Sequence, residues 1–320
     1  MKNFCLAVSL LLILLALTAC NPSGVYTAVE DLKFKDTVLR DCVVSEAQKN
    51  GWADAGHVLK LHCVNPDGQK ISSLSGIRHL ANLRELDLAH NALSDLSPLV
   101  ELERLERLEF DDNQITEFPD LVSSVALTHL SLNHNLIRDL GQISSLRHLE
   151  TLSLSSNHVE DVAPLQSHDS LRVLNLSHNN ISQISALGSL KNLRELDLSK
   201  NHIINISPLG NLHALEHLYL AGNDINDIAP LSDLYELREL DLANNELKNI
   251  GPLAQLKYMW RLSLDENPIE NIEPLLNLGE LELVSLKGVA NISCKTLEQL
   301  IRELGARAVI TEAECPAPSL

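Results

Sequence analysis

The 320-residue chain is poor in aromatic and basic residues. Trp, Tyr and Phe make up 3% of it, and 25 Lys and Arg stand against 43 Asp and Glu, giving a formal net charge of −18. Nucleic-acid-binding proteins carry basic stripes, so this charge argues against a nucleic-acid partner. It favours a basic protein or a cationic ligand, unless it serves only to keep a leucine-rich surface soluble.

Catalytic signatures are also missing from the chain. It contains no G-x-S-x-G, H-E-x-x-H or P-loop sequence. Carboxylates recur along most of its length, so no pair stands out as an acid–base couple. We therefore expect neither enzyme activity nor a cofactor.

What the chain does have is a 22-residue repeat. The common pattern is L-x-x-L-x-L-x-x-N-x-I-x-D-I-x-P-L, as in residues 193–209. A fixed period of this length predicts a solenoid of identical units, a class of fold that mostly binds other molecules. The asparagine recurs, without insertion or deletion, at Asn91, Asn113, Asn135, Asn157, Asn179, Asn201, Asn223, Asn245 and Asn267.

Each position of the repeat has a structural role. The alternation in its L-x-L core predicts a short strand with one buried face, and ten such strands stacked about 4.8 Å apart form a sheet roughly 45 Å long. The asparagine turns inward, where its amide satisfies the buried backbone of the bend. Proline, seven positions later, predicts turns or short 3₁₀ helices on the outer side. Units with Asp120, Gln142 or Ala186 in its place are expected to differ there.

This pattern, which covers residues 61–290, resembles the 22-residue class of leucine-rich repeat found in bacterial internalins and in a nuclear phosphatase regulator. The resemblance implies an α/β solenoid: an arc with a parallel, concave β-sheet and a convex side of turns and 3₁₀ helices. The class serves many partners, so it indicates binding without naming the ligand.

The N-terminus has the pattern of an exported protein. A charged start precedes an apolar run from Phe4 to Leu17, which is too short to span a bilayer and predicts a secretory signal peptide. Leu-Thr-Ala-Cys at residues 17–20 resembles the lipobox of bacterial lipoproteins. The resemblance implies cleavage after residue 19 and anchoring through acyl chains, such as palmitate, on Cys20. Asn21, in place of Asp, points to the outer membrane, on its surface or its periplasmic face.

Four cysteines remain after the lipidated one, Cys42 and Cys63 near the start and Cys294 and Cys315 near the end. Export places them in an oxidising compartment, and four cysteines allow three pairings. A solenoid separates its two ends, so we predict the disulfides Cys42–Cys63 and Cys294–Cys315. A zinc site is the alternative, but the chain has no C-x-x-C pair.

Both disulfides fall in segments that are expected to cap the open ends of the core. Residues 36–50 predict a helix that begins at Asp36 and ends before Gly51, and residues 293–304 predict another. Val289, where a tenth asparagine is due, marks the end of the array. The expected organisation is residues 1–19 as signal peptide, 20–32 as tether, 33–70 as N-terminal cap, 71–290 as repeats and 291–320 as C-terminal cap.

The positions beside the inward leucines line the open, concave face of the sheet. This face is polar and acidic, and its middle is rich in serine. Its later half carries Tyr219, Trp260 and Arg261, residue types that are enriched in binding hot spots. The candidate partner-binding residues are Glu85, Asp87, Arg107, Glu109, His129, Glu195, Asp197, His217, Tyr219, Glu239, Asp241, Trp260 and Arg261.

Three groups of residues raise the question of a metal site. His213 and His217 have H-x-x-x-H spacing, but the leucines around His217 place it on a strand, away from a shared helical face. Glu109, Asp111 and Asp112 lack the spacing of an EF-hand loop. The histidines before alternate asparagines are too far apart for one ion (His90, His134 and His178). We therefore expect no metal.

These observations predict a non-enzymatic module, lipid-anchored in the bacterial envelope, that recognises a protein on its concave face for adhesion or partner capture. The alternative is a periplasm-facing structural scaffold for envelope machinery.

Overall fold

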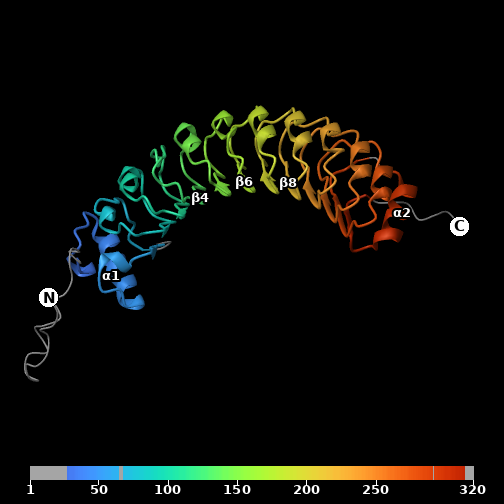
Figure 1. The fold of residues 1–320 in the computed structure, drawn as a ribbon. Helices are drawn as coiled ribbons and strands as arrows, with labels where there is room; N and C mark the ends of the chain where they lie inside the picture. Colours follow the sequence, from blue (N-terminus) through green and yellow to red (C-terminus); the bar gives the residue numbers. More distant parts are fainter. Residues whose placement is uncertain (1–26, 65–67, 291, 314–320) are drawn as a thin grey trace, which may run out of the picture.

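The computed structural model describes residues 27–64, 68–290 and 292–313, which form an open arc of stacked units (Figure 1). Its sheet contains twelve parallel strands in chain order. The strands are β1 Lys60–His62, β2 Glu85–Asp87, β3 Arg107–Glu109, β4 His129–Ser131, β5 Thr151–Ser153, β6 Val173–Asn175, β7 Glu195–Asp197, β8 His217–Tyr219, β9 Glu239–Asp241, β10 Arg261–Ser263, β11 Leu283–Leu286 and β12 Val309–Thr311.

The sheet has twelve strands rather than the ten expected from the repeats, because each cap adds one. At the start, β1 pairs with β2, and at the end β12 pairs with β11, with Val309 opposite Val284. The strand β12 has no counterpart among the elements predicted from the sequence. The concave sheet therefore continues into the C-terminal cap.

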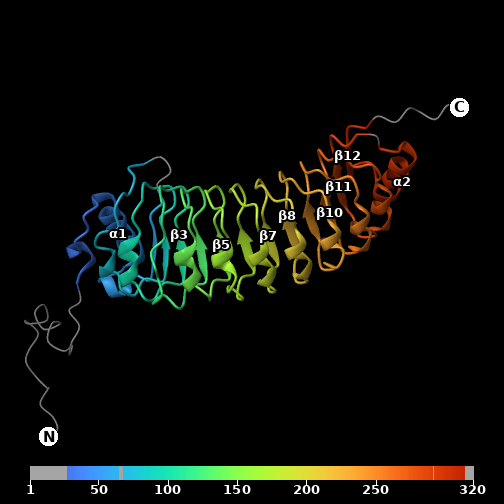
Figure 2. The ribbon, with the colours of Figure 1, turned by 90° about the horizontal axis from the view of Figure 1, so that it is seen from above.

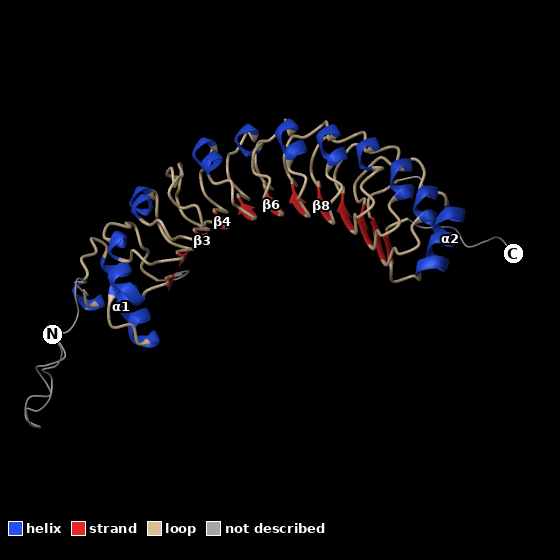
Figure 3. Cartoon of the chain, viewed as in Figure 1, coloured by secondary structure: helices blue, strands red, loops and turns tan. Residues whose placement is uncertain are grey.

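The strands line the inner side of the arc and the 3₁₀ helices line the outer side (Figure 3). In each repeat strand the middle residue is buried and its two neighbours lie on the concave surface, as the alternation predicts. The register places the middle leucines in one column, with Leu86 opposite Leu108 and Leu108 opposite Leu130. One continuous core thus runs the length of the arc.

The outer side is only partly set by proline. Six of its 3₁₀ helices carry proline in the first turn, but η5 and η7 form although Gln142 and Ala186 replace it, so the expected change there is wrong. Between β3 and β4, where Pro119 precedes Asp120, residues 113–128 contain no 3₁₀ helix, as expected. The 3₁₀ helices are η1 Val29–Asp31, η2 Ala55–His57, η3 Ile77–His79, η4 Ser97–Glu101, η5 Gly141–Ser145, η6 Ala163–Leu165, η7 Ser185–Ser189, η8 Ser207–Asn211, η9 Ala229–Leu231, η10 Gly251–Gln255 and η11 Glu273–Asn277.

The repeated asparagines turn inward and satisfy the backbone of the bends, as predicted. Because each one bonds to its own repeat and to the preceding repeat, together they form a ladder of hydrogen bonds along the arc. The Oδ1 of Asn201 accepts a hydrogen bond from the N–H of Ile181 in the preceding repeat at 2.9 Å. Its Nδ2 donates to the carbonyls of Leu176, also in the preceding repeat, and Leu198, in its own, both at 3.0 Å. The asparagines are all buried, so each satisfies backbone groups that no water reaches.

The N-terminal cap is built on α1 (Thr37–Asn50), with the predicted ends. Asp36 accepts hydrogen bonds from the N–H groups of the first turn, and Gly51 ends the helix in the left-handed conformation. Asp36 also accepts from the N–H of Ser72 at 2.8 Å, which ties the cap to the first repeat. Burial opposes ionisation, but these hydrogen bonds prevail and lower the pKa of Asp36.

The cap reaches further toward the N-terminus than the predicted boundary at residue 33. Val29 and Leu32 are buried in the core, and Ala28 pairs with Asp54 in an antiparallel bridge. The segment from Ala28 to Leu32 therefore belongs to the cap and not to a tether. The sequence indicates this packing through the spacing of Val29 and Leu32, because two apolar side chains three residues apart can both pack against α1.

The C-terminal cap consists of α2 (Cys294–Leu304) and β12. The helix matches the one predicted over residues 293–304: Leu297 and Leu300 are buried, and Gly305 follows its end. Seen from above, the two caps lie at opposite ends of the sheet (Figure 2). Within the described ranges, neither α1 nor α2 is long and apolar enough to cross a membrane.

Candidate protein-binding face

The concave face divides into two candidate regions separated by a polar middle. Glu85, Asp87, Arg107, Glu109 and His129 lie on β2–β4, whereas most of the other candidates lie on β7–β10. The strands between them, β5 and β6, carry Thr, Ser, Val and Asn on this face. The sequence-predicted residues therefore form two separate regions of the concave face rather than one site.

A row of side-chain hydrogen bonds extends from the end of β3, across β4, into the polar middle at β5. The Oδ1 of Asp111 accepts from the hydroxyl of Ser131 at 2.6 Å and from the N–H of Asn133 at 2.8 Å. The Oδ1 of Asn133 in turn accepts from the hydroxyl of Ser153 at 2.8 Å. Groups that are already paired in this way offer little to a partner, because binding must first break their bonds.

The N-terminal region is largely paired as well. Glu85 contacts Lys60 at 2.7 Å, and Arg107 contacts Glu109 at 2.6 Å. His129 lies 2.8 Å from the hydroxyl of Thr128. These are pairs between neighbouring charges on an exposed sheet and account for most of the candidate residues on β2–β4.

The C-terminal region is organised around Glu239, whose side chain is only 16% exposed. Its carboxylate accepts a hydrogen bond from the hydroxyl of Tyr219 at 3.1 Å and pairs with Arg261 at 3.1 Å. His217 lies 3.5 Å away. One carboxylate thus holds three side chains from neighbouring strands in fixed positions, which is the arrangement expected of a preformed binding surface.

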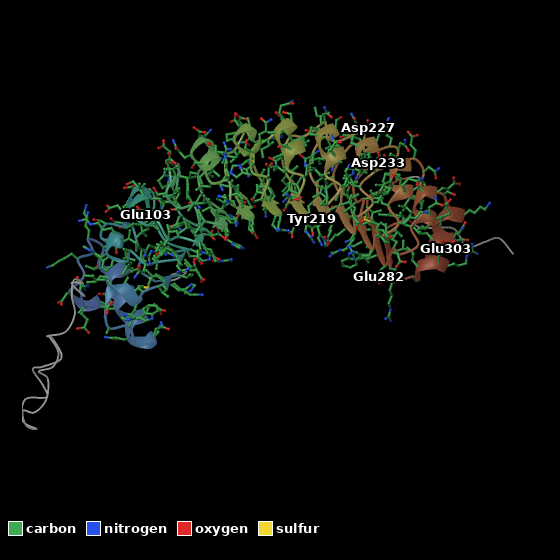
Figure 4. All side chains as sticks on the ribbon, in the orientation of Figure 1. Glu103, Tyr219, Asp227, Asp233, Glu282 and Glu303 are labelled. Carbon is green, nitrogen blue, oxygen red and sulfur yellow. A yellow bond between two sulfur atoms is a disulfide. The ribbon has the colours of Figure 1, made fainter. Side chains whose placement is uncertain are left out.

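Tyr219 is the aromatic residue at the centre of this region. It lies on the inner side of the arc, whereas Asp227 projects from the outer side (Figure 4). Burial, followed by the negative charge of Glu239, raises the pKa of Tyr219 well above its ordinary value. Its hydroxyl therefore stays protonated and acts as a donor.

A groove with a volume of about 440 Å³ lies beside Tyr219, over β8–β12. We call it the C-terminal groove. Three of the candidate residues besides Tyr219 line it, and β11 and β12 complete it. Its lining residues are Tyr219, Glu239, Leu240, Asp241, Arg261, Leu262, Ser263, Asp265, Leu283, Ser285 and Ile310.

Trp260, Glu195 and Asp197 lie outside this groove. Trp260 immediately precedes β10, and Arg238 holds the same position in the repeat before it. These positions form a row at the N-terminal ends of the strands. Glu195 and Asp197 lie on β7, next to β8. They are neighbours of the groove, and Glu195 contributes to the negative potential around Tyr219.

Seven of the eleven lining residues are not among the sequence-predicted candidates, and Ile310 is the one that lies outside the repeats. It lies on β12 and is 37% exposed. Residues 309–311 (Val-Ile-Thr) form a short β-branched run, the kind of segment that favours a strand. This run indicates a strand within residues 291–320, for which the sequence analysis expects only a helical cap.

The cysteines agree with the prediction as far as they are described. Cys42 and Cys63 form a disulfide with their Cα atoms 6.0 Å apart, which joins α1 to the segment after β1. Cys294 is disulfide-bonded. Cys315 and the lipidation candidate Cys20 lie outside the described residues, so the predicted pair Cys294–Cys315 and the acyl anchor stay predictions.

No group of three or more His, Cys, Asp or Glu side chains in the described part of the chain is placed to hold a metal ion. Asp111 is engaged in hydrogen bonds, and His217 lies on β8, as predicted. The row formed by His90, His134 and His178 belongs to the bends of the ladder. Each of the three has a φ between 53° and 59°, like most of the residues at this position in other repeats.

Solved structures with similar folds include two internalins of Listeria monocytogenes. Internalin inlF matches with a TM-score of 0.75 and 26% identity, covering 90% of this chain and 92% of inlF. Internalin C2 matches with a TM-score of 0.58 and 29% identity, covering 76% and 100%. The ectodomain of the receptor kinase GASSHO1/SCHENGEN3 of Arabidopsis thaliana, in complex with CASPARIAN STRIP INTEGRITY FACTOR 2, has a TM-score of 0.63 and 25% identity, covering 72% and 30%.

Family profiles match most of the repeat array. The profile described as "Leucine rich repeat" matches residues 147–203 and 169–225, and "Leucine Rich repeats (2 copies)" matches residues 81–123, 125–167 and 213–255. Sequence comparison with curated proteins finds no significant match. The leucine-rich-repeat fold is typical of protein-binding modules. The matched profiles and the twelve-stranded arc agree, and the chain belongs to the leucine-rich-repeat family, with an internalin-like architecture.

Proposed function

We propose that this protein is a non-enzymatic binding module, anchored by lipid to the bacterial envelope, that captures a protein partner on its concave face. Its family and its likeness to internalin inlF over nine-tenths of the chain support a binding role. The plant receptor ectodomain, which shares the fold, is itself in complex with CASPARIAN STRIP INTEGRITY FACTOR 2. These relatives support a protein as the class of partner.

The observation that carries the proposal is the C-terminal groove. It is hollow, it lies beside an aromatic residue and an arginine, and Glu239 fixes both of them. Tyr and Arg dominate the binding energy of many protein interfaces, especially where they are held in place before binding. The paired surface over β2–β6 lacks this combination.

The test is a pull-down from envelope extract, followed by binding measurements on whatever partner is recovered. Tyr219→Ala combined with Arg261→Ala removes both candidate hot spots. We expect affinity to fall by tenfold or more, the effect of losing roughly 1.4 kcal/mol.

Arg107→Ala is the matched control, because Arg107 is an arginine of similar exposure that also pairs with a glutamate on the concave face. It should bind like the wild type. If the Tyr219 and Arg261 double variant also binds like the wild type, the partner site lies elsewhere.

The lipid anchor rests on the lipobox-like sequence at residues 17–20. Cys20→Ser removes the thiol that would carry the acyl chain, so palmitate labelling and membrane association should both be lost. A variant that is still labelled and still fractionates with membranes contradicts the anchor.

The exposed side of the membrane decides between the two roles considered for the module. Brief protease treatment of intact cells should degrade a protein that acts in adhesion or capture at the surface. A protein that survives until the outer membrane is opened is instead a periplasm-facing scaffold. Asn21 favours the outer membrane in either case.

A further inference from the structure

We propose that the C-terminal groove receives a basic, extended segment of the partner, with a lysine or arginine side chain between Asp241 and Asp265. This inference rests on the proposed binding function and assigns the chemistry of the partner. It also places β12 of the C-terminal cap in the binding surface.

The charges that line the groove do not balance. Glu239, Asp241 and Asp265 line it together with a single base, Arg261, and that base pairs with Glu239. The two aspartates therefore give the groove a net negative charge that the lining itself does not neutralise. A cationic side chain complements this charge.

The two aspartates keep hydrogen-bonding capacity for a ligand. The Oδ1 of Asp241 accepts from the N–H of Ala243 at 3.0 Å, and the Oδ1 of Asp265 accepts from the N–H of Lys287 at 2.7 Å. Neither carboxylate forms an ion pair with any residue that the structure describes. Each second oxygen can therefore accept from an ammonium or guanidinium group.

The serines of the groove differ from those on β4 and β5. The hydroxyls of Ser131 and Ser153 donate to the side chains of Asp111 and Asn133. Ser263 and Ser285, which line the groove beside the aspartates, have no such side-chain partner among the described residues. Their hydroxyls are open to the backbone or side chains of an extended segment.

An apolar wall completes the groove. Ile310 on β12 is exposed, and Leu283 on β11 also lines the hollow. Lysine and arginine carry long apolar stems below their charged heads, and such stems pack on apolar side chains while the head reaches an acidic group. The combination of Ile310 with two aspartates thus fits a basic side chain better than a small cation.

The whole chain supports this choice of partner. Its net charge of −18 attracts basic proteins over a distance, which raises the rate of encounter. Such steering acts over the entire surface, whereas the groove provides a defined place for the positive group. The experiment must separate these two effects.

The experiment uses the mature chain and two fluorescently labelled peptides, hexalysine and hexaglutamate, with binding followed by fluorescence anisotropy. Asp241→Asn with Asp265→Asn removes two charges from the groove but keeps the Oδ1 acceptors for Ala243 and Lys287. The matched control is Asp139→Asn with Asp227→Asn. Both control residues are exposed on the convex side, before η5 and η9, and each accepts a backbone N–H two residues later, as Asp241 does.

We expect hexalysine to bind more tightly than hexaglutamate and the groove variant to raise its dissociation constant about tenfold. The control variant, with the same net charge, should raise it no more than about twofold. Equal losses in the two variants mean that only the overall charge attracts the peptide, and this overturns the proposal. Absence of hexalysine binding to the wild type overturns it as well.

The recovered partner separates this inference from the proposed function. Ile310→Ser and the groove variant should both weaken its binding, as Tyr219→Ala does. If only Tyr219→Ala weakens it, the concave face binds a protein, but the partner is not held by a basic segment, and this inference falls while the proposed function stands.

Discussion

At the scale of single residues, His168 is a polar side chain at an otherwise apolar position of the core. It is fully buried, at a position where the neighbouring repeats have Leu146 and Leu190. Its Nδ1 and Nε2 lie 3.2 Å and 3.1 Å from the carbonyls of Leu165 and Ile143. A neutral imidazole has one N–H, so it can donate to only one of them.

Burial lowers the pKa of His168 below 6.5, although hydrogen bonds to Ile143 and Leu165 oppose the shift. Arg147 lowers it further and Asp169 raises it. Because the folded state disfavours the imidazolium, the stability associated with neutral His168 is fully present above the unfolded value near 6.5. It is lost as the pH falls from that value through the lower pKa of the folded state.

We therefore expect His168→Leu to gain stability relative to the wild type as the pH falls from 8 to 5. The gain is limited to about 1.4 kcal/mol per pH unit, the maximum for one proton. At pH 8, His168→Leu also loses a hydrogen bond, which costs about 1 kcal/mol and offsets the stability gained from the better apolar fit. Urea unfolding at both pH values measures this, with the exposed His148→Leu as control. Stability curves for the wild type and His168→Leu that stay parallel across this range contradict it.

At the scale of the repeat, the asparagine connects units more than it shapes its own. Asn201 bonds to backbone groups of the preceding repeat as well as its own. Strand register and the leucine column bring the same repeats together. The ladder therefore adds specific polar pairing to an interface that is otherwise apolar, and loss of one asparagine leaves a buried N–H of the preceding repeat without its partner.

Asn201→Ala is expected to lower the free energy of unfolding by roughly 1–3 kcal/mol, the cost of one buried group without a partner. It leaves the N–H of Ile181 unpaired, whereas the carbonyls of Leu176 and Leu198 each keep a hydrogen bond from a neighbouring asparagine. The exposed Asn180→Ala tests whether asparagine loss in itself matters, and it should change stability by less than about 0.5 kcal/mol. Chemical denaturation gives both values, and a small effect of Asn201→Ala removes the structural role assigned to the ladder.

At the scale of the whole molecule, the arc is held together by contacts between consecutive units. Each strand contacts its neighbours in the sheet, and most consecutive 3₁₀ helices contact each other on the outer side. Stability in such a solenoid is close to a sum of unit and neighbour terms, so damage stays local. The caps, with one open side each, depend most on added links such as Cys42–Cys63.

Replacing Cys42 and Cys63 by serine should destabilise the N-terminal cap by about 3 kcal/mol, the chain-entropy value for a loop of this length. Hydrogen exchange should accelerate in α1, β1 and β2, whereas β8–β11 should keep their wild-type rates. Partner binding at the C-terminal groove should also be unchanged. Faster exchange spread over all strands would show that the solenoid unfolds as one unit.

Most of the scaffold was predictable because the same repeat pattern occurs nine times along the chain. The period fixes the strands, the ladder and the inward leucines, and capping residues such as Asp36 and Gly51 fix the ends of α1. The parts that were missed depend on packing between distant segments. Val29 and Leu32 are buried by α1, and β12 forms because β11 offers it an edge.

The candidate site was only partly predictable. Tyr219, Glu239, Asp241 and Arg261 follow from their rows in the repeat, since those rows lie on the concave face. Which positions within a row are free to bind a partner does not follow, because it depends on pairing across strands. Asp111 is engaged by Ser131 and Asn133, whereas Asp265 in the same row lines a hollow.

The strict register of the strands has a consequence for distance. From β1 to β10 the sheet advances nine steps of about 4.8 Å, or roughly 43 Å along its curve. If Cys20 anchors the chain as proposed, the membrane lies beside the first strand and the groove near the last. The repeat array then acts as a spacer arm whose length is counted in whole 22-residue units. Removing one unit would bring the partner one strand closer to the bilayer.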